Sequence, residues 1–433
     1  SGPTMAEVPI LVVGGGPAGA SAAATLVEAG LRVLLIEQRD RLGGAIHRQT
    51  ASGAESPVWR PARHRRNWAA LTARLGAAAE RIDIRTQTVF LGVDGEGRFL
   101  FEDRRSERVL ARRPRAAIIA VGAIETIRPF PGWELPGVMT VGGAQVLLKE
   151  TGRPPAGPVL IAGSGPLLPA LAAQLARAGN PPVAVLERGR PWRAPGALAR
   201  LILSGGPTGE AASYAAVLAA HRVPYRCGAS ALRAEPDGDG LKVACRIGTS
   251  EQSLHVRHLL IHDGIVPNRT GIPLPAPEAA VPVLQAGDGR EALGADAAIL
   301  DGRRAALQVL ARLGHASTAG AASLERPLQR ARDFQAALAE ALHSARVAPS
   351  PETLICRCEG RSYADLAALA EDASAREIRL MGRFGLGACQ GRLCGPMIEA
   401  LRAQPLPATS SPRWPLRPVS VAALARLTAD ETE

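Results

Sequence analysis

The chain has 433 residues, of which 46% are hydrophobic and 21% charged, so it can form a sizeable core and two or three domains of about 150 residues each. The net charge of +11 does not indicate nucleic-acid binding, because the arginines are spread along the chain and aromatic residues make up only 3% of it. No apolar run reaches the roughly 18 residues that span a bilayer, and no export signal is seen, so we expect a cytoplasmic protein without a transmembrane segment.

The N-terminal region has the pattern of a strand–helix–strand unit that binds a dinucleotide. An apolar run at 8–13 predicts a buried parallel strand, an Ala-rich stretch at 18–28 predicts a helix, and the run at 31–36 predicts a second strand. The G-x-G-x-x-G turn allows a tight bend, close approach of a pyrophosphate and close helix–strand packing, and the helix N-terminus attracts phosphates. The predicted cofactor-binding residues of this turn are Gly14, Gly16, Pro17, Ala18 and Gly19.

An acidic residue and a second pair of glycines extend this predicted site. Glu37 ends the second strand, where a carboxylate would bind ribose hydroxyls, and Gln38 and Arg39 follow it directly. Gly43 and Gly44 then bring more backbone close to the pyrophosphate. Strand, helix, glycines and acid agree, so we favour a functional dinucleotide site over an empty glycine-rich turn.

Far downstream, Gly287 and Asp288 precede an Ala-rich helix that is predicted to start near Ala295. Here the sequence resembles FAD-binding folds of the glutathione reductase type, in which such a Gly-Asp pair lies on the ribityl–phosphate part of the cofactor. The resemblance implies FAD rather than NAD in the first site. It also implies that segment 269–347 returns to the first domain.

A degenerate copy of the same pattern follows in the middle of the chain. A strand at 158–162, a G-x-G turn, a helix at 167–178 and a strand at 183–186 predict a second Rossmann-like unit. Leu168 occupies the third glycine position, and a bulky residue there moves the helix away from the strand. A scaffold without nucleotide is therefore favoured over a NAD site. If a nicotinamide binds, Glu187 favours NAD over NADP because it repels a 2′-phosphate.

The remaining segments predict the parts that surround these units. Alternating apolar and polar residues at 89–109 and the β-rich segment 230–262 predict small antiparallel sheets, and 116–121 predicts another buried strand. The Pro-rich segment 267–282 is expected to be a crossover, and a helix is expected at 324–343.

Four of the six cysteines predict a metal site near the C-terminus. They form a C-x-C pair and a C-x₄-C pair, and in a chain without an export signal such clustered thiols indicate metal ligands rather than disulfides. Both a [2Fe–2S] cluster and structural zinc are compatible with four thiolates. The tight C-x-C spacing and the nearby Arg357, Arg361 and Arg392 favour the anionic iron–sulfur cluster. The candidate ligands are Cys356, Cys358, Cys389 and Cys394.

Side-chain catalysis is not predicted for this chain. It has no C-x-x-C redox dithiol of the thioredoxin reductase kind and no convincing Ser/His/Asp or Cys/His set. His47 and His64 lie downstream of the glycine pair and could approach a cofactor, but we favour a structural role for both. Cys227 and Cys245 are interpreted as small core residues.

Nearly end to end, the sequence resembles the larger flavoprotein subunits, termed alpha or A, of opine oxidases, D-hydroxyproline dehydrogenase and hydrogen cyanide synthase. It is more distantly similar to the alpha chain of heteromeric sarcosine oxidase. The C-terminal cysteine motif resembles the [2Fe–2S] domain of bacterioferritin-associated ferredoxins. The motifs that carry the resemblance are 14–19, Gly43-Gly44 followed by Arg48, Val121-Gly122-Ala123, 129–133, 135–138, 162–167, Asp263-Gly264, Pro267-Asn268, 286–288, 356–359 and 389–395.

This resemblance implies that the chain relays electrons within a larger oxidoreductase, and it adds Arg48 and Gly122 to the cofactor site. A D-amino-acid-oxidase-like beta subunit would oxidise the amine, FMN would sit at the interface with it, and a small ferredoxin-like gamma subunit would complete the complex. Some relatives hold only an adenine nucleotide in place of FAD. The sequence departs from the family at 45–47, where Gln and Tyr are expected. Peripheral attachment at the inner membrane, through the electron acceptor, is the alternative to a purely cytoplasmic location.

The fold class expected is α/β, with two tandem Rossmann-like domains and a small helical [2Fe–2S] domain. The expected ranges are 5–150 and 269–347 for the FAD domain, 151–268 for the degenerate NAD-type domain, 348–404 for the cluster domain and 405–433 for a covering tail. Two rival functions stay open: a self-contained NAD(P)H-dependent FAD oxidoreductase, and a non-catalytic scaffold subunit that binds a nucleotide and a metal.

Overall fold

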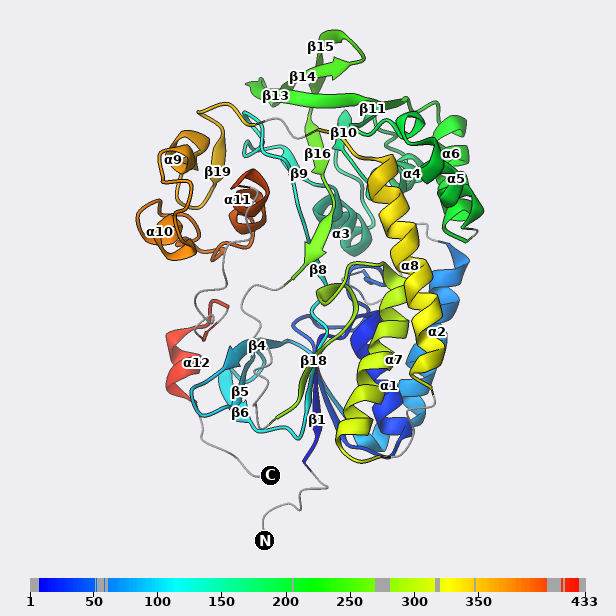
Figure 1. The fold of residues 1–433 in the computed structure, drawn as a ribbon, viewed down its shortest axis with the longest axis vertical. Helices are drawn as coiled ribbons and strands as arrows, with labels where there is room; N and C mark the ends of the chain where they lie inside the picture. Colours follow the sequence, from blue (N-terminus) through cyan, green and yellow to red (C-terminus); the bar gives the residue numbers. More distant parts are fainter. Residues whose placement is uncertain are drawn as a thin grey trace.

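Figure 1 shows the fold of the chain as a computed structural model. The structure describes residues 8–50, 52, 58, 61–204, 206–268, 281–315, 320–345, 348–402, 414–415 and 417–427. Residues 269–280 of the expected crossover and most of the expected tail 405–433 lie outside this range. Within the described residues, no helix combines the length and apolarity needed to cross a bilayer.

The first unit is built on a five-stranded parallel sheet of order β18-β7-β1-β2-β3. Both faces of this sheet are covered, and β1 is therefore apolar throughout. Ile10 and Val12 pack against helices on one face, whereas Leu11 and Val13 pack against a second sheet on the other. The strands are β1 (Ile10–Val13), β2 (Val33–Ile36), β3 (Ile82–Arg85), β7 (Ala117–Ile119) and β18 (Val283–Gln285).

Helices and an antiparallel sheet form the two outer layers of this unit (Figure 1). Phe90 and Phe101 of the antiparallel sheet pack against the β1 side chains Leu11 and Val13. The helices are α1 (Pro17–Glu28), α2 (Ala62–Ala77) and α7 (Ala295–Arg312), with the short η1 (Ala79–Arg81) and η3 (Gly287–Gly289), and the antiparallel strands are β4 (Thr88–Val93), β5 (Phe99–Asp103) and β6 (Arg108–Arg112).

The second unit repeats this plan with a parallel sheet of order β12-β11-β10-β16-β9. Val159 and Ile161 face the helices, and Leu160 and Ala162 face an antiparallel sheet. The parallel strands are β9 (Val138–Thr140), β10 (Val159–Gly163), β11 (Ala184–Glu187), β12 (Tyr225–Cys227) and β16 (His258–His262). The covering elements are α3 (Val141–Thr151), α4 (Leu167–Arg177), η2 (Pro191–Arg193), α5 (Pro195–Leu203), α6 (Gly206–Ala220), β13 (Ala229–Asp237), β14 (Gly240–Ile247) and β15 (Ser250–Val256).

Two short antiparallel strands, β8 (Ala123–Glu125) and β17 (Ile265–Pro267), connect the units. The chain then re-enters the first sheet, where Val283 of β18 pairs with Ala117 of β7 and α7 packs on α1. Helix α8 (Ala322–Ala341) packs on α7 and reaches α5 of the second unit (Figure 1).

The cysteine region forms a small module on the antiparallel sheet of the second unit (Figure 1). Ile355, Phe384 and Ile398 share a core with Trp133, whose indole Nε1 donates a hydrogen bond to the Leu354 carbonyl at 2.7 Å. Helix α12 (Val421–Ala425) packs separately, against β4 to β6. The elements of the module are β19 (Leu354–Cys356), β20 (Arg361–Ser362), α9 (Tyr363–Ala367), α10 (Ala375–Leu380) and α11 (Cys394–Arg402).

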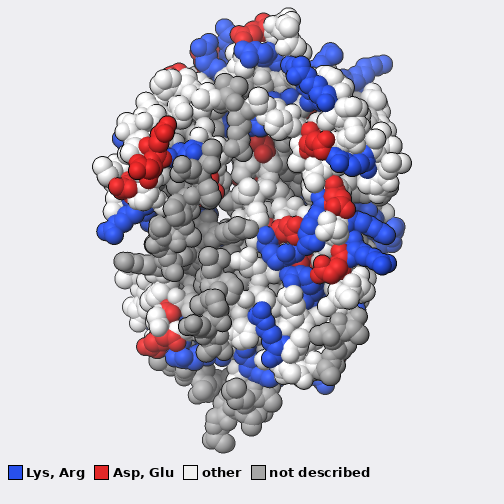
Figure 2. Space-filling model, in the orientation of Figure 1, with Lys and Arg blue, Asp and Glu red and all other residues white. Residues whose placement is uncertain are grey.

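The expectation of an α/β chain with two Rossmann-like sheets is confirmed. The first two strands begin two residues later than predicted, at Ile10 and Val33. Leu168, at the third glycine position of the second unit, is fully buried. Helix α4 begins at Leu167, directly after the proline of its turn, whereas α1 begins at its own turn proline, Pro17. Figure 2 shows basic side chains interspersed with acidic ones on the visible face, without one large basic block. The role of the cysteine module stays a prediction.

Candidate functional site

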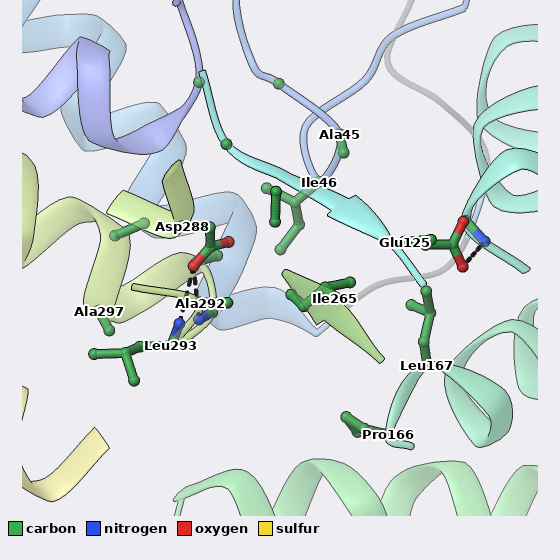
Figure 3. A pocket seen from close by; sticks show the side chains of 18 of the residues that line it. Ala45, Ile46, Glu125, Pro166, Leu167, Ile265, Asp288, Ala292, Leu293 and Ala297 are labelled. Carbon is green, nitrogen blue, oxygen red and sulfur yellow. Dashed lines mark hydrogen bonds between the residues drawn. The ribbon is translucent and has the colours of Figure 1, made fainter. Parts of the chain in front are cut away.

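A cleft of about 2000 Å³ lies between the two units and is lined by both. Ordinary ligand pockets enclose roughly 300–1000 Å³, so this cleft has room for a dinucleotide and a further group. Figure 3 shows Asp288 and Glu125 on opposite sides of the cavity, with Ile46 and Ile265 between them. The predicted site residues that line the cleft are Gly14, Gly16, Pro17, Ala18, Glu37, Gln38, Arg39, Gly44, Arg48, Gly122 and Asp288.

The turn between β1 and α1 requires glycine at two positions. Gly14 has a φ of +103°, and a Cβ there would lie 2.4 Å from the carbonyl oxygen of Ala120. A Cβ at Gly19 would lie 1.8 Å from the carbonyl oxygen of Gly14, so α1 could not pack this closely on β1. A Cβ at Gly16 would meet nothing nearer than the Gly44 Cα at 3.7 Å, so the turn is open on that side.

The N-terminus of α1 meets the cleft without a side-chain cap. Gly16 is the N-cap residue and Pro17 the first helical residue. Helix N-termini carry a partial positive charge and unpaired N–H groups, both of which favour a phosphate. This end of α1 is therefore a suitable anion-binding position.

Glu37 lies at the end of β2 with only 7% of its surface exposed. Its two carboxylate oxygens accept hydrogen bonds from the backbone N–H groups of Gly15 at 2.8 Å and Arg39 at 2.9 Å. Burial raises the pKa of Glu37, and the backbone hydrogen bonds oppose that rise. The carboxylate is held rigidly at the rim, where it can accept further hydrogen bonds from hydroxyl groups.

Helix α3 of the second unit holds the loop that carries the glycine pair. Lys149 is buried and its Nζ donates to two carbonyl oxygens of this loop, at 3.0 and 3.3 Å. Glu150 accepts from Arg48 at 2.6 Å and from Arg39 at 2.7 Å. The Nε of Arg48 is buried and has no hydrogen-bond partner within the described chain. It is thus available to a ligand in the cleft.

The Gly287–Asp288 turn is held by Asp301, an aspartate that belongs to none of the predicted motifs. Asp301 on α7 is 3% exposed and accepts from the Gly287 N–H at 2.8 Å, and it also binds Arg290 and Arg304. Asp288 accepts at Oδ1 from two backbone N–H groups at 3.0 and 3.1 Å (Figure 3), and burial raises its pKa. No local motif marks Asp301, because its role depends on a turn that lies earlier in the chain.

Asn268 is a second residue outside the predicted site, although it belongs to a motif of the family resemblance. It is 6% exposed and lines the cleft, and its backbone N–H binds the carbonyl oxygen of Gly122 at 3.0 Å. Its Oδ1 is buried without a hydrogen-bond partner among the described residues. A buried, unsatisfied amide oxygen is costly, so it indicates a missing donor such as a cofactor group.

In the second unit, the position that would bind a ribose is closed by the chain itself. Glu187 is fully buried, and its carboxylate accepts from the backbone N–H groups of Gly165 at 3.0 Å and Gly189 at 2.6 Å. The Tyr225 hydroxyl also bonds to it. Leu342, just after α8, covers the turn, since a Cβ at Gly189 would lie 2.8 Å from its Cα. A nucleotide would have to displace this segment.

The two histidines named from the sequence take part in packing and ion pairs. His47 stacks on Trp68 with ring centroids 4.8 Å apart. His64 is 3.4 Å from Glu210 and lines the rim of the cleft. Burial opposes ionisation of Glu210, but hydrogen bonds from His64 and Tyr214 lower its pKa. The contact of His64 with Glu210 joins α2 to α6, which agrees with a structural role for His64.

The four clustered cysteines lie together in the C-terminal module. Cys356 and Cys394 are buried, Cys389 is half-buried and Cys358 is exposed. The side chains of Cys358 and Cys389 are in hydrogen-bond contact, and so are those of Cys356 and Cys394. Among the described residues, no three His, Cys, Asp or Glu side chains converge in a group that could hold a metal ion. The predicted metal site therefore stays a prediction.

The neighbouring arginines have different surroundings. The Arg357 guanidinium lies 5.9 Å from the ring centroid of Trp133, a cation–π distance. Arg361 pairs with Asp365 at 2.8 Å. Arg392 is partly buried beside Cys389, and burial lowers its pKa. The positive charge of Arg392 interacts with the Cys389 thiol.

The family model for pyridine nucleotide-disulphide oxidoreductases matches residues 8–287, which include both parallel-sheet motifs. The chain belongs to this family. The A subunit of opine oxidase from Agrobacterium tumefaciens is 32% identical over 96% of this chain and 91% of its own length. Hydrogen cyanide synthase subunit HcnB from Pseudomonas aeruginosa is 29% identical over 96% of this chain and 98% of its own length. L-proline dehydrogenase from P. horikoshii shares the fold, with a TM-score of 0.64 and 19% identity over 97% of this chain and 79% of that one.

Pyridine nucleotide-disulphide oxidoreductases are flavoproteins, and membership of the family implies FAD binding. The cleft fits such a group: an uncapped helix N-terminus for the pyrophosphate, a fixed carboxylate at Glu37, and the unsatisfied Asn268 Oδ1 all face it. Gly19, Gly43 and Gly287 do not line the cleft. They act through backbone packing, which brings the lining residues into place.

The closed second site leads to a prediction about nicotinamide cofactors. We expect excess NADH to leave the flavin of the purified chain oxidised, because Glu187 and the α8 end fill the place of the adenine ribose. The measurement is the anaerobic absorbance of the flavin band, with dithionite as the control that bleaches it. Rapid bleaching by NADH would mean that the segment at Leu342 opens and would revive the self-contained reductase.

Proposed function

We propose that this chain is the electron-transfer subunit of a heteromeric dehydrogenase or oxidase that acts on amino acids or opines. The similar full-length chains carry the names of subunits, the A chain of opine oxidase and HcnB of hydrogen cyanide synthase, which supports a complex of several chains. A D-amino-acid-oxidase-like beta subunit would oxidise the CH–NH or CH–NH₂ bond, with FMN at its interface with this chain. A small ferredoxin-like gamma subunit is a further expected partner.

In this proposal FAD occupies the cleft, where it would accept electrons in pairs and pass them on singly. The N–H groups at the start of α1 would bind the pyrophosphate, and Glu37 would orient the adenosine ribose. Asp288, held by two backbone N–H groups, would bind the ribityl–phosphate part. An adenine nucleotide alone is the alternative occupant, since the contacts at α1 and Glu37 reach phosphate and ribose rather than the flavin ring.

The observation that carries the relay proposal is that two cysteine motifs, distant in the sequence, bring their thiols together in two pairs. Cys356 contacts Cys394, and Cys358 contacts Cys389, so the thiols form two close pairs. Two pairs suit the two irons of a [2Fe–2S] cluster, whereas one zinc ion needs four ligands around one point. Arg392 adds positive charge beside the predicted anionic cluster.

The deciding experiment is an anaerobic absorbance spectrum of the purified full chain, with iron, sulfide and zinc analysis of the same sample. Flavin bands, broad visible absorption and two irons per chain are expected. Chromatography of the released nucleotide then separates FAD from FMN and from an adenine nucleotide. A colourless protein that contains one zinc ion would overturn the relay and leave a scaffold role.

A further inference from the structure

A histidine–carboxylate pair lies in the cleft and has no role in the function proposed so far. His262 is the last residue of β16 and Glu125 the last of β8, and both line the cleft. The Nδ1 of His262 lies 2.7 Å from Oε1 of Glu125. Their side chains are only 3% and 14% exposed. In doubly wound folds, ligands bind at the carboxyl ends of parallel strands, which is where His262 stands.

Both members of the pair are held in one orientation. Oε1 of Glu125 also accepts from the Gly142 N–H of α3 at 2.9 Å (Figure 3). A carboxylate at Nδ1 holds the proton there and leaves Nε2 as the position that can accept another. The ring lies against the second glycine turn, where a Cβ at Gly165 would come within 3.3 Å of Nε2. A side chain at position 165 would therefore crowd the ring, and the φ of +130° there also favours glycine.

The pair stands where the strands cross from the flavin unit to the second unit. Gly122 and Asn268, on the flavin side, flank the β8–β17 connection, and Ile265 pairs with Glu125 across it. In Figure 3, Glu125 faces Asp288 across a cavity whose middle is lined by apolar Ile46 and Ile265. An apolar middle between polar ends suits a flat aromatic ring.

Other charged groups near His262 are already engaged. Glu187 accepts from the N–H of Gly165, on the turn that touches the ring. Asp263, the next residue, pairs with Arg188 and accepts from the backbone N–H of Arg128. The first turn of α3 carries no acidic residue. Glu125 is therefore the group that acts directly on the imidazole.

We propose that His262, oriented by Glu125, accepts the proton that is released when the reduced flavin in the cleft is reoxidised by a one-electron iron acceptor. The inference rests on the proposed function. Anionic reduced flavin loses two electrons and one proton to become oxidised flavin, so two equivalents of the acceptor are reduced and one proton must leave. His262 takes this proton at Nε2 and passes it to water. In this scheme Glu125 is a positioning residue.

The test uses the flavin-loaded full chain, reduced photochemically and reoxidised by ferricenium in a stopped-flow instrument from about pH 5 to 9, the range around the histidine titration. The wild-type rate should rise with pH through one titration. His262→Gln should lower the rate by about 10²-fold and remove this dependence, since a positioned base contributes roughly 10²–10⁴-fold. Added imidazole should restore part of the loss.

Glu125→Gln keeps the size of the side chain and should weaken the pH dependence while the flavin stays bound. Nitrogen NMR of the labelled protein gives a readout independent of turnover, because the wild-type ring should carry its proton on Nδ1 and the loss of the negative charge in Glu125→Gln should lower the share of this tautomer. The matched control is His255→Gln. His255 forms a similar pair with Asp237 at 2.6 Å, but that pair is exposed on β15.

The outcomes separate the two proposals. If His262→Gln and Glu125→Gln retain flavin and show the wild-type rate and pH profile, the proton acceptor is wrong and the relay stands. If the wild-type chain takes up no flavin, the proposed function itself fails. A loss of rate in His255→Gln equal to that in His262→Gln would also overturn the assignment, because it would reflect a general effect of removing histidine.

Discussion

Replacing Asp301 with Asn is expected to lower the free energy of unfolding by about 3 kcal/mol, since removing one partner of a buried ion pair leaves the other charges unpaired. Asp301 binds Arg290, Arg304 and the Gly287 N–H, and it thereby connects α7 to the cofactor turn. We also expect weaker FAD binding, because Asn has one acceptor oxygen where Asp301 uses two to hold the Gly287–Asp288 turn together with both arginines. Urea unfolding and flavin titration measure the two effects.

The effect of this substitution should depend on pH in one direction. Burial alone would raise the pKa of Asp301, but hydrogen bonds from Arg290 and Arg304 outweigh it and lower the pKa below the ordinary 3.8. The stabilisation is therefore complete above the unfolded pKa and is lost as pH falls through the lower folded value. The gap between wild type and Asp301→Asn should be full at neutral pH and shrink below about pH 4.

A matched control for Asp301 is Asp83→Asn on β3. Asp83 also pairs with an arginine, Arg85 at 2.8 Å, but the two side chains are 53% and 38% exposed. Exposed pairs contribute about 0–1 kcal/mol, so this variant should unfold nearly like the wild type. Equal destabilisation by the two substitutions would contradict the role of buried Asp301.

Replacing Cys358 with Ser is expected to abolish electron transfer from the assembled complex to dyes or quinones, while the partner subunit still binds its substrate. The physical reason is the loss of one of four thiolate ligands, which leaves an iron of the predicted cluster incompletely held. Cys358 is exposed, so its substitution should disturb folding less than that of buried Cys356 or Cys394. Iron content, visible absorption and dye reduction are the measurements.

Cys227→Ser provides the control for the cluster prediction. Cys227 is a half-buried cysteine on β12, outside the C-terminal module, and its substitution should leave iron content and dye reduction unchanged. Unchanged turnover in Cys358→Ser would show that electrons do not pass through this module. Retained flavin in that variant is also expected, because the cleft and the cysteine module are built from different elements.

The sequence alone determined the features that depend on short segments of backbone. The roles of Gly14 and Gly19 can be predicted from the sequence because a tight turn and a closely packed helix leave no room for a Cβ, independently of the rest of the fold. The buried strands can be predicted because a sheet that is covered on both faces needs strands that are apolar throughout. The two Rossmann-like units and the polar end of β2 at Glu37 follow from these local constraints.

The tertiary structure decided the features that arise between distant segments. Leu342 closes the second nucleotide position over Gly189, although the sequence pattern around Leu168 indicated only a weakened site. His262 and Glu125 form an oriented hydrogen-bonded pair because β8 and β16 end at the same cleft. Asp301 gains its role because α7 packs beside the cofactor turn. Each effect depends on which side chains from distant segments lie together in the low-dielectric interior. The hydrophobic periodicity of a single segment does not contain that information.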